Sequence, residues 1–153
     1  MNWNLRKMET GDVAAVAKIE QICFSDPWSE KMVADLTDSS WDEVWVLETE
    51  ENGLIGYINF RFIAGEGELM RIAVLPELRG HGLSRKLMDK MTESASKNAV
   101  TDITLEVRAG NEPAIGLYKA YGFAGEAVRK GYYHNPAEDA LIMWVHDLPS
   151  ISS

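Results

Sequence analysis

Apolar residues recur along the chain with two different periods. Between residues 10 and 23 they return every three or four positions, which predicts a helix with one apolar side that is capped at its start by Thr10. Residues 101–111 alternate between apolar and polar side chains, which predicts a strand with one buried face. Segments of the two kinds follow one another along the chain, and this succession is typical of an α/β protein.

The same patterns, interrupted by glycine and proline, predict the remaining elements. Strands are predicted over residues 3–8, 42–49, 54–64, 65–75, 101–111, 123–135 and 138–148. Helices are predicted over residues 10–23, 28–36, 75–98 and 112–122. Short turns within residues 42–75 favour an antiparallel meander. The order of elements indicates a mixed α/β sheet with helices on both faces, and the lack of repeats or linkers indicates one domain over residues 1–153.

Composition and charge narrow the classes of protein to which the chain can belong. Apolar residues make up 46% and charged residues 25% of the 153 residues, which is typical of a soluble globular domain. The net charge of −9 argues against a protein that binds nucleic acid directly and favours cationic partners. No apolar run is long enough for a signal peptide or a membrane span. We therefore expect a cytoplasmic protein, and the small size and acidic surface are consistent with a monomer.

Cysteine and histidine provide no pattern for a metal site. The single cysteine, Cys23, excludes an intrachain disulfide and a cysteine-based metal cage. The three histidines, His81, His134 and His146, are too widely scattered to form a short metal-binding motif. We expect no bound metal.

The segment between residues 69 and 91 combines a strand, a short loop and a helix that begins after two glycines. Gly80 and Gly82 leave backbone N–H groups uncovered, and these groups, with the partial positive charge of the helix, favour phosphate oxygens. Four basic residues and one acidic residue lie close by, namely Arg79, Arg85, Lys86, Lys90 and Asp89. The segment is interpreted as an anion site, and a capped surface helix with solvated basic residues is the alternative.

Other phosphate-binding loops fit this segment less well. A Walker-type loop requires the pattern GxxxxGK followed by Ser or Thr, which the sequence lacks. A dinucleotide-binding loop has its first glycine directly after the strand. Here residues 75–79 separate Val74 from Gly80, and Arg85 stands where the third glycine belongs.

Residues 79–84, RGHGLS, resemble the acetyl-CoA motif of the GNAT acetyltransferases, in which Arg or Gln is followed by x-x-Gly-x-Gly/Ala. Ser84 departs from the Gly or Ala of the last position and adds a hydroxyl where the backbone approaches pyrophosphate. Further blocks, LEVRAGNEPAIGLYKAYGF, the Tyr132–Tyr133 pair, EDALIM and the earlier IEQICFSDPWSEK, are similar to the bacterial ribosomal-protein-alanine N-acetyltransferases. The resemblance covers residues 5–145 and implies a GNAT-type mixed, mostly antiparallel sheet.

The resemblance implies two catalytic residues. Glu106, in LEVRA, matches the proton acceptor of the family, and Tyr118, in LYKAYGF, matches the proton donor. An α-amino group has a pKa of about 7.7–8.0 and must lose a proton before it attacks a thioester. A carboxylate accepts that proton directly or through one water, and a phenol supplies one to the departing thiolate. The alternation of residues 101–111 places Glu106 opposite the apolar face of its strand.

The resemblance also implies which residues contact acetyl-CoA. The strand segment formed by Ile72, Ala73 and Val74 matches the segment that pairs with the pantetheine arm. The residues that match the pyrophosphate loop are Gly80, His81, Gly82, Leu83, Ser84 and Arg85. Asn111 matches a further coenzyme contact, although its position alone indicates the cap of the following helix. The side chains of Ile72 and Leu83 can equally belong to the core.

The function implied is direct transfer of acetyl from acetyl-CoA to the N-terminal amine, alanine in the family, of a basic ribosomal protein. A GNAT enzyme that acetylates a small amine or a lysine side chain is the first competing hypothesis. The second is a module that binds acetyl-CoA without catalysis, and the third is an adaptor that binds ribosomal proteins. Tyr132 and Tyr133 either line a peptide groove or are half-buried strand aromatics.

Overall fold

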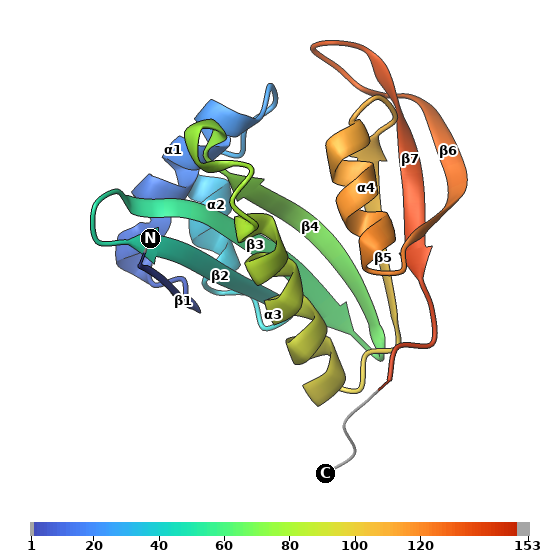
Figure 1. The fold of residues 1–153 in the computed structure, drawn as a ribbon, viewed down its shortest axis with the longest axis horizontal. Coiled ribbons are helices and arrows are strands. Elements are labelled where there is room, and N and C mark those ends of the chain that lie inside the picture. The colour runs from blue at the N-terminus through green and yellow to red at the C-terminus, as the bar shows by residue number, and fades with distance from the viewer. Residues whose placement is uncertain (1, 150–153) are drawn as a thin grey trace. The chain divides into compact units, whose positions relative to one another are not determined.

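The structure is a computed structural model that describes residues 2–149, and its strands form one seven-stranded sheet (Figure 1). The order across the sheet is β1-β2-β3-β4-β5-β7-β6. The strands are β1 (Trp3–Lys7), β2 (Asp42–Thr49), β3 (Gly53–Ile63), β4 (Glu66–Val74), β5 (Asp102–Arg108), β6 (Ala124–Tyr133) and β7 (Glu138–Val145). Strand β2 pairs antiparallel with β1 and β3, and β7 pairs antiparallel with β5 and β6, whereas β4 and β5 run parallel. The predicted mixed, mostly antiparallel sheet is therefore confirmed.

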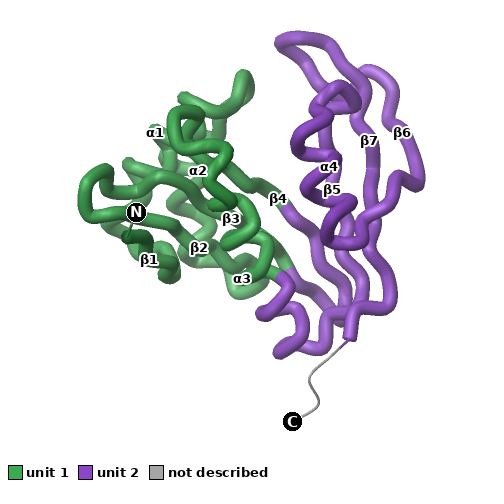
Figure 2. Tube along the Cα trace, in the orientation of Figure 1, with its two compact units in different colours: residues 1–61, 70–91 green, residues 62–69, 92–153 purple. Residues whose placement is uncertain are grey.

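The chain divides into two compact units, shown in different colours in Figure 2. The N-terminal unit comprises the residues up to 61 together with 70–91. The C-terminal unit comprises 62–69 together with the residues from 92 onward. The two units share β3, β4 and the long helix α3 (Leu83–Lys97).

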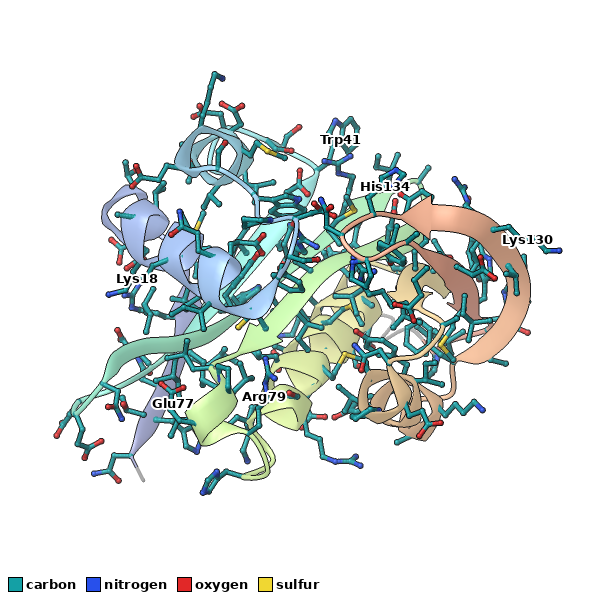
Figure 3. All side chains as sticks on the ribbon, turned by 90° about the horizontal axis from the view of Figure 1, so that it is seen from above. Lys18, Trp41, Glu77, Arg79, Lys130 and His134 are labelled. Carbon is teal, nitrogen blue, oxygen red and sulfur yellow. The ribbon has the colours of Figure 1, made fainter. Side chains whose placement is uncertain are left out.

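The N-terminal unit has helices on both faces of its strands, with α1 (Val13–Cys23) and α2 (Glu30–Leu36) on one side and the start of α3 on the other (Figures 1 and 3). The apolar side of α1 packs on the sheet through Val16 and Ile19, which contact a cluster that includes Tyr57 and Ala73. The predicted period of three and four residues therefore identifies the buried side of this helix.

The start of the first helix differs from the prediction that Thr10 caps it. The chain first makes a single 3-10 turn (Thr10–Asp12), and Glu9 occupies the N-cap position. The Glu9 backbone N–H donates to the Asp12 carboxylate at 2.8 Å. With this extra turn the N-cap is Glu9, one residue before Thr10. Asp12 stands three positions after Glu9, from where its carboxylate can accept the Glu9 N–H.

The C-terminal unit places the apolar face of β5 in its core. Ile103, Leu105 and Val107 are buried, and the residues between them are partly exposed, as the alternation predicts. The following helix, α4 (Glu112–Ala120), begins at Asn111, whose side chain accepts the Ala114 N–H at 3.3 Å. Beside β7, the edge strand β6 is exposed along nearly its whole length.

Candidate active site

The glycine-containing loop joins the end of β4 to the start of α3. After β4 the chain makes a 3-10 turn (Pro76–Leu78) and then passes through Gly80 and Gly82, whose φ angles are +84° and +74°. Residues with side chains rarely adopt this left-handed conformation, so the path of the loop requires glycine at both positions. The loop leads to the N-terminus of a 15-residue helix, where backbone N–H groups favour an anion.

The side chain of Arg79 connects this loop to the end of β4. Its Nε donates to the Val74 carbonyl oxygen at 3.0 Å, and its backbone N–H donates to the Pro76 carbonyl oxygen at 3.3 Å. His81 makes a similar local contact, with Nδ1 3.1 Å from the Leu78 carbonyl oxygen. These contacts tie the loop to the end of β4 and to its own 3-10 turn.

Two of the basic residues that the sequence grouped around the loop lie against tryptophan rings. The Lys86 ammonium is 4.9 Å from the centre of the Trp3 ring, and the Lys90 ammonium is 4.4 Å from that of Trp45. Cation–π contacts of this kind fix the position of a charge without neutralising it. The first turns of α3 are therefore linked to β1 and β2 through these two lysines.

The side chains at the predicted coenzyme positions differ in burial. Ala73, Val74 and Leu83 are buried, so their side chains belong to the core. Ile72 is half-buried, and Gly80, His81 and Gly82 are exposed. The Leu83 side chain therefore belongs to the core, as one of the two interpretations predicted. The contact between the Leu83 backbone and pyrophosphate stays a prediction.

Glu106 projects from the face of β5 opposite the core and meets two residues of β6. Its Oε1 lies 3.9 Å from Nη2 of Arg129, whose guanidinium is in turn 5.5 Å from the centre of the Tyr132 ring. The hydrogen bond to the Glu106 carboxylate and, to a smaller extent, partial burial raise the pKa of the Tyr132 hydroxyl. Glu106 Oε2 is buried and has no hydrogen-bond partner among residues 2–149. One oxygen of this carboxylate therefore keeps unused capacity to accept a hydrogen bond.

Tyr118 is buried in α4, and its ring packs edge-on against Phe123 with 6.1 Å between centres. Burial and, to a smaller extent, the electrostatic effect of the nearby Tyr133 raise the pKa of the Tyr118 hydroxyl far above its ordinary value. The phenol is therefore protonated throughout the neutral range. It can donate a hydrogen bond or a proton, but it does not carry charge at rest.

The Tyr132–Tyr133 pair connects the surroundings of these two side chains. Tyr132 faces Glu106, Tyr133 lies close enough to influence Tyr118, and the two tyrosine rings meet edge-on at 5.1 Å. Arg129 was not identified from the sequence, and no local pattern marks it. It reaches Glu106 across strands whose register shifts between Arg129 and Tyr133, which residue spacing does not reveal.

The predicted site residues fall into two groups, one in each unit. The N-terminal unit contains the coenzyme positions Ile72–Val74 and Gly80–Arg85, and the C-terminal unit contains Glu106, Asn111 and Tyr118. Among residues 2–149 no group of three His, Cys, Asp or Glu side chains is arranged to hold a metal ion. No helix in the same range is long and apolar enough to cross a membrane.

Comparison with known proteins finds relatives over most of the chain. The profile described as "Acetyltransferase (GNAT) family" matches residues 13–123. A protein of Escherichia coli (strain K12) named ribosomal protein bS18-alanine N-acetyltransferase is 33% identical over 142 residues, which cover 91% of this chain and 94% of that protein.

Solved structures show the same fold. The crystal structure of the ribosomal-protein-S18-alanine N-acetyltransferase from Escherichia coli aligns with a TM-score of 0.87 and 31% identity, over 99% of this chain and 97% of that one. Arabidopsis thaliana NAA60 in complex with acetyl-CoA aligns with a TM-score of 0.85 over 95% of this chain and 98% of that one. At 16% identity, this second likeness concerns the fold alone.

Proposed function

Since this chain belongs to the acetyltransferase (GNAT) family, we propose that it transfers the acetyl group of acetyl-CoA to the N-terminal alanine of a ribosomal protein. The observation that carries the proposal is the similarity, over nine tenths of the chain, to a relative named for this activity. We take residues 1–153 as one acetyl-CoA-dependent domain. The proposed substrate places the protein in the cytoplasm, and the net charge of −9 suits a basic N-terminus.

In the proposed reaction, acetyl-CoA lies along the N-terminal unit. The backbone of Ile72–Val74 pairs with the pantetheine arm as an added strand would. The N–H groups from Gly80 to Arg85 receive the pyrophosphate oxygens at the start of α3. Ser84, in place of Gly or Ala, adds a hydroxyl at this position. The coenzyme requires no metal in this arrangement.

The proton transfers use the two proposed catalytic residues. Glu106 accepts a proton from the substrate ammonium, directly or through one water, and the free amine attacks the thioester carbonyl carbon. The new C–N bond forms, the second amine proton also leaves to solvent or base, and the C–S bond breaks. Tyr118 donates its proton to the departing thiolate and regains one from solvent. The products are the acetylated N-terminus and CoA.

Mass spectrometry of synthetic peptides tests this function. Peptides that begin with Ala, Ser, Gly or Met and continue with basic residues are incubated with acetyl-CoA and the purified protein. We expect acetylation at the N-terminal amine, fastest for alanine, and none for the same peptide with a blocked N-terminus. Acetylation of a polyamine or an internal lysine, with all free N-termini left unmodified, would overturn the assignment of the substrate.

A further inference from the structure

Arg71 holds the connection between α1 and α2 against β4. Its Nη2 donates to Glu20 Oε1 at 3.0 Å and to the Asp26 carbonyl at 2.9 Å. The guanidinium also lies over two rings of that connection, 4.0 Å from the centre of Phe24 and 4.7 Å from that of Trp28. One side chain of β4 thus makes four contacts with the stretch of chain that includes residues 20–28.

Glu20 completes this arrangement from inside the core. It is fully buried on α1, and its Oε1 accepts the Trp28 backbone N–H at 2.7 Å as well as the Arg71 donor. Its Oε2 accepts the hydroxyl of Tyr57, which is also fully buried. The carboxylate therefore joins α1, β3, β4 and the α1–α2 connection at a single point.

Stability alone does not explain the cluster of Arg71, Glu20 and Tyr57. Removing a carboxylate from water is costly, and a buried ion pair often stabilises a fold no more than apolar residues of similar size. In addition, the Nε of Arg71 is buried and has no hydrogen-bond partner among the described residues. A buried donor without a partner destabilises the folded state. What the cluster provides is one defined conformation of the α1–α2 connection.

The fixed connection lies beside the strand proposed to bind pantetheine. Arg71 directly precedes Ile72–Val74, and Cys23, the last residue of α1, lies with its Sγ 3.7 Å from the Val74 carbonyl oxygen. The segment from Phe24 to Trp28 therefore runs next to the end of β4. In the proposed function the pyrophosphate lies beyond the end of β4, so the thioester, at the other end of the pantetheine arm, lies toward Ile72 and Arg71. The segment that Arg71 contacts therefore borders the path of the incoming amine.

We propose that Arg71 and Glu20 form a latch that fixes residues 24–28 in the conformation that receives the acceptor peptide. This inference rests on the proposed function, because it assumes that the acceptor approaches the thioester beside Arg71 and Ile72. Arg71 is a positioning residue in this scheme and takes no part in proton transfer. Its loss weakens productive binding of the acceptor and leaves the backbone of Ile72–Val74 able to bind the coenzyme.

Steady-state kinetics of Arg71→Gln, with Arg61→Gln as its matched control, tests the latch. Arg61 pairs at 3.1 Å with Asp42, whose carboxylate is also buried, so both substitutions remove an arginine from a buried carboxylate. We expect Arg71→Gln to raise the KM for the acceptor peptide by about tenfold or more, with an unchanged Kd for CoA. Arg61→Gln should leave the KM near that of the parent. Equal KM values in Arg71→Gln and the parent would overturn the proposal.

Two further variants keep the test decisive if Arg71→Gln fails to fold. The double substitution Glu20→Gln with Arg71→Gln removes both charges and leaves no uncompensated buried carboxylate. It should fold and still show the raised KM. Arg71→Lys keeps the charge but loses the planar guanidinium that lies over the two rings, so an intermediate KM is expected. A folded double variant with the KM of the parent would contradict the latch.

Hydrogen exchange of the Trp28 amide supplies a readout independent of activity. This N–H donates to Glu20, so opening of the latch exposes it to solvent. We expect much faster exchange of this amide in the Arg71 variants, while amides of β2 keep their protection. The two proposals can fail separately. If the parent protein acetylates no peptide but the Trp28 amide exchanges faster in the Arg71 variants, the proposed function is wrong, and Arg71 still fixes residues 24–28. Unchanged exchange at Trp28, with an active parent enzyme, would refute the latch alone.

Discussion

Gly56 lies so close to Ala73 that a Cβ on Gly56 would stand 2.6 Å from the Ala73 carbonyl oxygen. The backbones of β3 and β4 approach each other at this point, within the strand segment proposed to pair with pantetheine. Gly56→Ala must displace the Ala73 peptide, at a cost of about 1–3 kcal/mol of stability. We expect a lower melting temperature and weaker binding of acetyl-CoA in titration calorimetry.

Gly116→Ala is the control for this substitution. An added Cβ at Gly116 meets nothing within 4 Å, and the residue lies inside α4. Alanine in a helix is more favourable than glycine by about 1 kcal/mol, so this variant should be slightly more stable with unchanged affinity. If the Gly56→Ala variant binds acetyl-CoA as tightly as the parent, the proposal that the strand segment at Ala73 binds the coenzyme is wrong.

Glu106→Gln keeps the shape of the side chain and removes its ability to accept a proton. General base catalysis contributes typically about 10²–10⁴-fold, so kcat/KM should fall by a factor in that range. The half-exposed position outside the core predicts little change in folding. Kinetics with an N-terminal alanine peptide, together with calorimetry of CoA binding, separates the two effects. Glu112→Gln, on the exposed start of α4, should retain full activity, and equal rates in both variants would exclude Glu106 as the base.

Tyr118→Phe removes only the hydroxyl of a buried ring that packs against Phe123. Because the pKa of this hydroxyl is raised, the parent carries the proton across the neutral range, and the variant lacks the donor at every pH. We expect kcat to fall by about 10²-fold or more while the melting temperature changes little. Single-turnover measurements with preformed acetyl-CoA complex would show the loss in the chemical step. A variant with the turnover of the parent would rule out the phenol as the acid.

His146 makes the stability of the C-terminal unit depend on pH. Its Nδ1 lies 2.6 Å from the Asp102 carboxylate and its Nε2 lies 2.7 Å from that of Glu126. These hydrogen bonds, first that to Asp102, raise the pKa of His146 above its ordinary value of about 6.5. The stabilisation is therefore fully present below about pH 6.5 and is lost as the pH rises through the higher pKa of the folded state.

The carboxylate partner sets the acid limit of the same interaction. Hydrogen bonds from Thr101 and His146 lower the pKa of Asp102, so its contribution is present above about pH 3.9 and is lost as the pH falls through the lower value. Melting temperatures of the parent and His146→Gln, measured from pH 5 to 9, should differ most near pH 5–6 and converge at high pH. A difference that grows with rising pH would contradict this assignment.

The sequence by itself determined the local elements and the residues that face their buried sides. The alternation in residues 101–111 correctly placed Ile103, Leu105 and Val107 in the core and Glu106 opposite them. The cap at Asn111 was predicted correctly, because there a polar side chain reaches an N–H three residues away. The cap at Thr10 was wrong because an added 3-10 turn moved it to Glu9. These features depend on neighbours within about four residues along the chain, so the order of the residues is enough to predict them.

Only the tertiary structure decided which distant side chains meet. Arg71 and Glu20 are 51 positions apart, and no spacing in either segment marks them as partners. Arg129 reaches Glu106 only because β6 and β5 both flank β7 and the register of β6 shifts. Strand order and register set such contacts, and they follow from packing the whole chain around its cores. A pattern of neighbouring residues carries no record of that packing, so it placed Glu106 on the open face of its strand and gave no sign of the arginine beside it. The proposed role of Glu106 as base came from the family resemblance.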